Sequence, residues 1–123
     1  MATIRTSLAL VITASFLGGC YGNIDSFSKR AAALSCKRTK ECDGQVFEDQ
    51  YKGDMGRCKD DVEDAYHDQF DPLIDDQGCD YDPKEGRKCI HTANKLKKDC
   101  SDDADQDIAD DCAEVLDCPN GGG

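Results

Sequence analysis

Nine cysteines are the residues most capable of chemistry in this sequence of 123 residues. One of them, Cys20, directly follows an apolar run, and the other eight are spread along the rest of the chain. Those eight are Cys36, Cys42, Cys58, Cys79, Cys89, Cys100, Cys112 and Cys118. No two are spaced as Cys-x-x-Cys, which argues against zinc ribbons, thioredoxin-like redox centres and c-type haem. An even number without metal-site spacing predicts four disulfides, for which 105 pairings are possible.

Other candidates for chemistry are weak. The two histidines, His67 and His91, have no partner at a recognisable metal-site spacing, so we predict no metal ligand. His67, beside Tyr66, is expected to be a residue of the surface or of its boundary, and not to act as a general base. Nucleophile-elbow, phosphate-loop and zinc-protease motifs are all missing from the sequence. The sequence therefore predicts no catalytic residue, no cofactor and a protein that is not an enzyme.

Two acidic stretches keep calcium binding open as an alternative. The first has carboxylates at the ligand positions of an EF-hand loop: Asp103, Asp105, Asp107, Asp111 and Glu114. However, Ile108 occupies the place where that loop needs glycine, and the stretch also has a helical pattern. The second is a looser group around Gly78: Asp75, Asp76, Asp80 and Asp82. The missing glycine disfavours a specific calcium site in the first stretch.

The elements that position these cysteines begin with a targeting segment. Arg5 is its only charge, and the apolar run from Leu8 to Leu17 is too short to span a bilayer, which takes about 20 residues. The end of this segment, Leu17-Gly18-Gly19-Cys20, resembles the lipobox of bacterial lipoproteins. The resemblance implies that Cys20 carries a diacylglycerol and that residues 1–19 are removed. An ordinary signal peptide followed by a chance cysteine is the alternative.

Composition after the leader indicates one small domain that depends on disulfides. Removing residues 1–19 leaves 104 residues, with 14 basic against 26 acidic side chains and only fourteen Leu, Ile, Val and Phe. So small an apolar content usually belongs to disordered chains, but small exported domains compensate with disulfides of about 2–4 kcal/mol each. The strong negative charge argues against a nucleic-acid partner.

Helical periodicity predicts an all-α fold, a small disulfide-stapled bundle of four or five short helices. A lipidated tether at 20–25 precedes the domain at 26–118, and 119–123 forms a flexible tail. The first helix is expected from a Ser26 cap to Cys42, and a short second one over 45–52. A third is expected over 57–70, ended by Asp71-Pro72. The last two are expected over 83–98, after an Asp82 cap, and over 105–117. No strand is expected, and 73–78 should be a loop.

Two hairpins would fix part of the disulfide pairing. If helices 83–98 and 105–117 turn near Asp103, Cys89 lies opposite Cys118. By the same geometry, the first helix and that of 57–70 bring Cys42 near Cys58. The other four cysteines are left without a predicted partner.

A second resemblance covers most of the chain after Cys20. The stretch Cys79-Asp80-Tyr81-Asp82, followed by Cys89, and the earlier pattern Cys36, Cys42, Phe47, Tyr51, Cys58 resemble small cysteine-rich lipoproteins of myxobacteria and related bacteria. This resemblance implies architecture and location only, with no catalytic residue to transfer. Non-acidic Tyr21 resembles an outer-membrane sorting pattern, which would place the lipid anchor in the outer membrane of the bacterial cell envelope, with the domain facing the periplasm or the outside.

We therefore expect a lipoprotein held at the membrane through lipidated Cys20. It would act as a non-catalytic interaction module for an unidentified protein partner. The alternatives are a divalent-cation (calcium) binding module, or an accessory factor or inhibitor of an envelope or natural-product enzyme.

Overall fold

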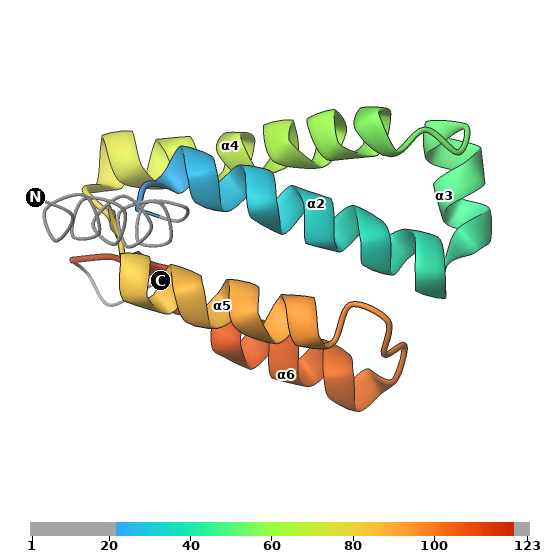
Figure 1. Cartoon of the computed structure of the whole chain (residues 1–123). Helices are drawn as coiled ribbons and strands as arrows, with labels where there is room; N and C mark the ends of the chain where they lie inside the picture. The colour runs from blue at the N-terminus through green and yellow to red at the C-terminus, as the bar shows by residue number, and fades with distance from the viewer. Residues whose placement is uncertain (1–21, 120–123) are drawn as a thin grey trace, which may run out of the picture.

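The computed structural model describes residues 22–119, which form five α-helices and one pair of two-residue strands (Figure 1). The all-α fold class predicted from the sequence is confirmed. The elements are α2 (Ile24–Cys42), α3 (Gly44–Tyr51), α4 (Met55–Gln77), β1 (Asp80–Tyr81), α5 (Pro83–Lys95), α6 (Asp102–Cys112) and β2 (Leu116–Asp117).

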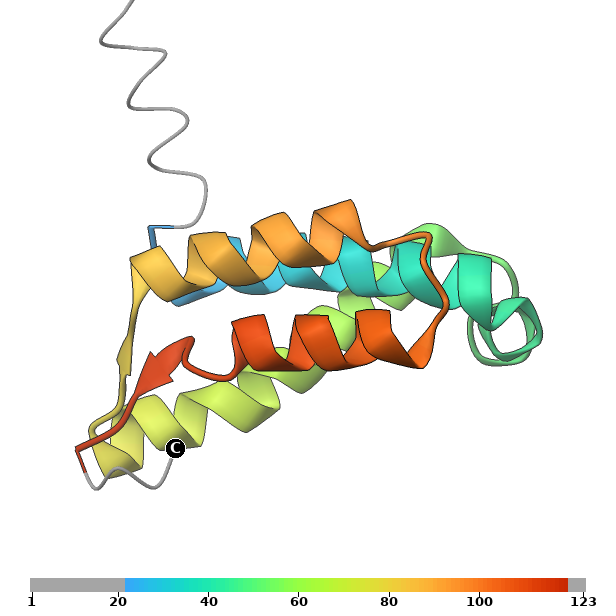
Figure 2. The same ribbon diagram turned by 90° about the horizontal axis from the view of Figure 1, so that it is seen from below.

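The described helices form two antiparallel hairpins that pack together. In the first, α2 and α4 run in opposite directions and short α3 closes one end (Figure 1). In the second, α5 and α6 run antiparallel beside each other (Figure 2). Helix α2 contacts both α4 and α5, so it is the element through which the two hairpins meet.

The first helix begins earlier than predicted. Its N-cap is Asn23, whose side-chain oxygen accepts a hydrogen bond of 2.8 Å from the backbone N–H of Ser26. The predicted cap at Ser26 is wrong, because Ser26 lies inside the first turn and its own N–H is capped by the Asn23 side chain. Residues 24 and 25 of the predicted 20–25 tether consequently belong to the helical domain.

Helix α4 continues past the proline that was expected to end it. Pro72 lies inside the helix, which ends instead at Gly78 with φ 72°, so the predicted loop over 73–78 is wrong. The backbone N–H of Cys79 donates to the carbonyl of Leu73 at 3.0 Å and completes the glycine cap. An interior proline costs about 3 kcal/mol, so packing of the helix and this strong cap outweigh the local preference.

The second hairpin turns earlier than predicted. The Asp82 cap is confirmed, since its Oδ1 accepts from the N–H groups of Lys84 and Glu85 at 3.0 and 3.3 Å. Helix α5 stops at Lys95, and Ser101 caps α6 through the N–H of Ala104 at 3.2 Å. The turn therefore occupies 96–101 rather than the region of Asp103, because the Ser101 cap starts the second helix there.

The two short strands were not expected. Asp80 pairs with Asp117 and Tyr81 pairs with Leu116, antiparallel. A strand of two residues has no detectable alternation, and this pair lies next to the Cys79–Cys118 disulfide that brings the two segments together. The ladder is thus a consequence of tertiary structure rather than of local sequence.

Four disulfides join the eight cysteines after Cys20, as predicted. The pairs are Cys36–Cys58, Cys42–Cys100, Cys79–Cys118 and Cys89–Cys112. Two of these disulfides contribute to the hydrophobic clusters: Cys36 and Cys58 pack with Phe47, while Cys89 packs in a second cluster with Phe27, Ala31, Leu34, Ile90 and Val115. This sulfur-rich packing supplements the small number of large apolar side chains.

Both specific pairings predicted from hairpin geometry are wrong. Cys89 pairs with Cys112 and not with Cys118, because the turn lies at 96–101 and shifts the register towards the N-terminus. Cys58 pairs with Cys36 and not with Cys42. Helix α3 lies between the end of α2 and the start of α4, so Cys42, the last residue of α2, lies beyond the position opposite Cys58. Cys42 is then free to join the turn of the second hairpin at Cys100.

Candidate functional site

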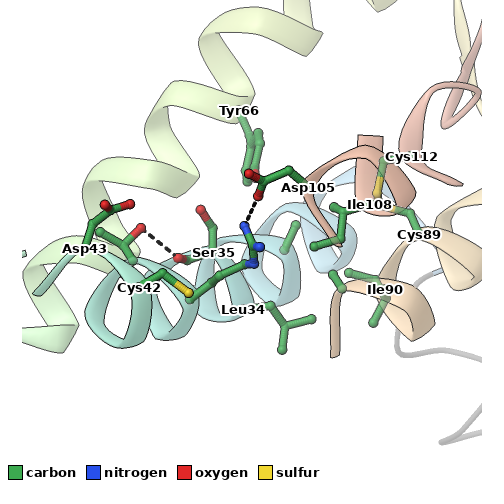
Figure 3. A pocket seen from close by; sticks show the side chains of 14 residues that line it. Leu34, Ser35, Cys42, Asp43, Tyr66, Cys89, Ile90, Asp105, Ile108 and Cys112 are labelled. Atoms are coloured by element: carbon green, nitrogen blue, oxygen red, sulfur yellow. Dashed lines mark hydrogen bonds and ion pairs between the residues drawn. A yellow bond between two sulfur atoms is a disulfide. The ribbon is translucent and has the colours of Figure 1, made fainter. Parts of the chain in front are cut away.

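A cavity of about 230 Å³ lies where α2 meets the α5–α6 hairpin, with Tyr66 of α4 on its wall (Figure 3). Its apolar lining comes from α2, α5 and α6: Ala31, Leu34, Cys89, Ile90, Ala93, Ile108 and Cys112. The Cys89–Cys112 disulfide holds α5 and α6 together on this wall. The cavity is therefore built by the junction of the two hairpins and requires both.

Arg38 is the principal charged residue of the cavity. Its Nη1 donates to the Asp105 carboxylate of α6 (Figure 3), and its Nη2 donates to the backbone carbonyl of Asp99 in the turn. The third donor, Nε, is buried and has no hydrogen-bond partner among the described residues. A buried donor without a partner costs about 1–3 kcal/mol, so a shift of the Arg38 side chain that let Nε meet an entering acceptor would recover this cost.

Asp99 and Tyr66 have perturbed acidities beside this arginine. The pKa of Asp99 is lowered, first by the hydrogen bonds from Ser101 and then by the charge of Arg38. Burial raises the pKa of Tyr66, and a hydrogen bond with the Ser35 side chain partly opposes that rise. The phenol of Tyr66 therefore stays neutral at physiological pH and offers the site a hydroxyl group on an aromatic wall.

The size and chemistry of the cavity limit what it can accept. Pockets for drug-sized ligands occupy roughly 300–1,000 Å³, so about 230 Å³ suits a single large side chain or a very small molecule. Among the described residues that line it there is no histidine, and its three cysteines are all in disulfides. The arrangement can bind an apolar group and hydrogen-bond an acceptor beside it.

The acidic residues considered for calcium have other positions. The stretch from Asp103 to Asp111 is helical within α6, as its pattern indicated, so its carboxylates do not line one loop. Asp105 pairs with Arg38, and Asp111 accepts a hydrogen bond from Thr92. Asp82 of the looser group caps α5.

Several residues of the cavity were not identified from the sequence. Leu34, Ser35, Arg38 and Cys42 lie on one stripe of α2, at helical spacing. Only the apolar members of this stripe were predicted from the sequence to form a buried helix face, and Ser35 and Arg38 were overlooked. The signal was Arg38, the one charged residue among these four. Cys20, the predicted lipidation site, lies outside the described residues.

The chain was compared with known proteins at three levels. No family model, no curated protein and no solved structure matches it. Over residues 22–119, every helix is too short or too polar to cross a membrane.

Proposed function

We propose that this chain is a lipid-anchored bacterial lipoprotein that acts outside the cytoplasm as a non-catalytic interaction module. In this proposal residues 1–19 are removed, Cys20 is lipidated, and the helical domain stands on the outer membrane, facing the periplasm or the outside. It is not an enzyme and binds no nucleic acid. The cavity between the hairpins receives one large apolar side chain of a partner protein.

Two features support the location. Four disulfides in a domain of this size are typical of oxidising compartments outside the cytoplasm. The leader ends in Leu17-Gly18-Gly19-Cys20, the segment that resembles a lipobox. The two features are independent, because the disulfides lie in the described domain and the lipobox lies before it.

The cavity with the buried, unpaired Nε of Arg38 is the observation that carries the interaction function. Binding energy at protein interfaces concentrates in a few anchors that fill well-packed pockets. An anchor here would bring an apolar side chain to Leu34 and Ile90 and, with a small shift of the Arg38 side chain, a backbone carbonyl to its Nε. The excess of 26 acidic over 14 basic side chains after residue 19 and the carboxylate of Asp43 at the cavity favour a partner segment with basic residues beside that anchor.

Lipidation is tested by labelling cells that produce the protein with a palmitate analogue. The wild type is expected to incorporate label and to partition into the detergent phase. Cys20→Ala should lose both, while the four disulfides remain. An unlabelled, soluble wild-type protein from its own host would overturn the anchoring proposal.

The interaction is tested by photo-crosslinking in the intact envelope. A crosslinking amino acid at Thr39, which lines the cavity, should give a discrete adduct with one protein. The control has the same group at Lys59, an exposed residue of α4 outside the cavity lining. Equal or absent adducts at both positions would contradict a partner site at the cavity.

A further inference from the structure

His67 lies among three carboxylates at the opposite end of the first hairpin from α3. Glu63 is one helical turn before it on α4, Asp71 is one turn after it, and Asp25 comes from the first turn of α2. Figure 1 shows the beginning of α2 beside the second half of α4. From the sequence, His67 was given no partner at a recognised metal-site spacing, whereas the structure brings these three carboxylates to its ring. The signal in the sequence was Glu-x-x-x-His-x-x-x-Asp, which aligns the three side chains on one helix face.

The ligand atoms around His67 are close enough to share one ion. Its Nε2 is 3.3 Å from Oδ1 of Asp25 and 3.9 Å from Oε2 of Glu63, and one ligand atom of each residue lies within 4.8 Å of the others. Bonds of about 2.0–2.1 Å in a tetrahedral site place neighbouring ligands about 3.3 Å apart. The Asp25–His67 distance already matches this value, whereas Glu63, at 3.9 Å from Nε2 and within 4.8 Å of Asp25, must move inward.

We propose that Asp25, Glu63 and His67 form a binding site for a divalent transition-metal ion of the zinc class. An imidazole nitrogen with two carboxylate oxygens suits zinc and neighbouring first-row metals. Calcium and magnesium prefer oxygen ligands alone, so the site differs from the calcium module considered from the sequence. Three protein ligands leave one tetrahedral position for water.

Asp71 acts as the positioning residue of this site. Its Oδ1 is 3.3 Å from Nδ1 of His67, on the opposite side of the ring from the two ligand carboxylates. Histidines that bind metals commonly donate their second ring N–H to a carboxylate, which fixes the tautomer and orients the ring. With Nδ1–H donated to Asp71, Nε2 is the ring nitrogen directed at Asp25 and Glu63, and it would supply its lone pair to a bound ion in place of a proton. An exposed cluster of carboxylates alone would lack this feature.

A bound ion would complete the attachment of α2 to α4. The Cys36–Cys58 disulfide joins these helices at the end nearer α3, whereas Asp25 and His67 meet towards the other end. The ion would therefore act as a second cross-link on the same helix pair. Lys29 is 3.9 Å from the other carboxylate oxygen of Asp25, so it leaves Oδ1 available.

Protons compete with the ion at this site. The pKa of His67 is raised, mainly by its hydrogen bond to Asp71 and further by Asp25. Since the metal requires the neutral imidazole, affinity should fall as pH decreases through that raised pKa. Without a metal, the same groups would be ion pairs of a protonated histidine, which is the competing explanation.

The test is zinc titration of the oxidised full-length protein carrying Cys20→Ala, which removes a competing thiol. A chromophoric chelator reports affinity, and imidazole NMR signals report which histidine binds. Zinc should shift the His67 signals and leave those of His91 unchanged. His91 is exposed and lies near Arg30 and Arg87, so His91→Ala is the matched control.

One equivalent of zinc should bind. His67→Ala should weaken binding at least 100-fold, and Asp71→Asn should weaken it 10–100-fold. His91→Ala should have no effect, and equal calcium should not compete. If His67→Ala does not fold, as judged by circular dichroism, Glu63→Gln serves in its place with the same expected loss. An unshifted His67 signal, or variants that bind within threefold of the parent protein, would overturn the proposal.

Discussion

Replacing Gly86 by alanine should destabilise the protein although alanine is the better helix former. Gly86 is buried in α5, and a Cβ atom built there lies 2.1 Å from Oη and 2.7 Å from Cζ of Tyr81. Both separations are far below van der Waals contact. The ring of Tyr81 must therefore move, and with it the contact to Phe27, whose ring centroid is 5.6 Å away.

The magnitude follows from opposing contributions. Alanine in place of an interior helical glycine stabilises by up to about 1 kcal/mol. Overpacking typically costs about 1–3 kcal/mol, and loss of an aromatic pair costs about 0.5–1.5 kcal/mol more. We expect Gly86→Ala to lower the free energy of unfolding by about 2 kcal/mol, measured by urea denaturation of the oxidised protein.

A matched control and a second measurement isolate the cause. Gly44 begins α3 and has no heavy atom within 4 Å of an added Cβ, so Gly44→Ala should be neutral or slightly stabilising. Burial is the main cause that raises the pKa of Tyr81 to about 12. In Gly86→Ala the displaced ring should titrate closer to 10, as followed by tyrosinate absorbance. A variant as stable as the wild type, with an unchanged Tyr81 pKa, would refute this packing.

Three further predictions concern stability. Serine at both Cys42 and Cys100 opens a loop closed over a sequence separation of 58 residues, and should cost about 4 kcal/mol in urea denaturation. In chelator, His67→Gln should be less stable than the wild type at acidic pH. Because the pKa of His67 is raised in the folded state, its protonated form stabilises the fold, fully so below the ordinary histidine pKa near 6.5. The difference in unfolding free energy between wild type and variant should therefore vanish as the pH rises through the pKa of His67 in the folded state. Asp82→Ala removes the cap of α5 and should cost about 1 kcal/mol in the same assay.

Local signals predicted the elements whose ends depend on nearby residues. Asp82, Pro83 and Glu85 together defined the start of α5, because capping and dipole effects act within one helical turn. Pro72 shows the limit of such rules, since the packing of α4 and the Gly78 cap outweigh its local preference. The ends of α5 and α6 were misplaced by up to five residues.

Disulfide pairing and the binding site depend on distances that no local rule contains. The turn between α5 and α6 lies a few residues before its predicted position, so the partner of Cys89 is Cys112 and not Cys118. The cavity brings Arg38 of α2 to Asp105 of α6, residues that are 67 positions apart. The cluster around His67 had a readable local component, the two carboxylates four residues away on either side, but its fourth member, Asp25, required the tertiary fold.

Filling the cavity while monitoring the crosslink from Thr39 tests the proposed interaction most directly. Ala93 of α5 lines the cavity, whereas Ala109 of α6 is exposed outside it. Ala93→Leu should occupy the space of the partner's side chain and abolish the adduct, with unchanged circular dichroism and melting. Ala109→Leu should leave the adduct intact. An adduct that persists at full yield in Ala93→Leu would contradict the conclusion that this cavity holds the partner.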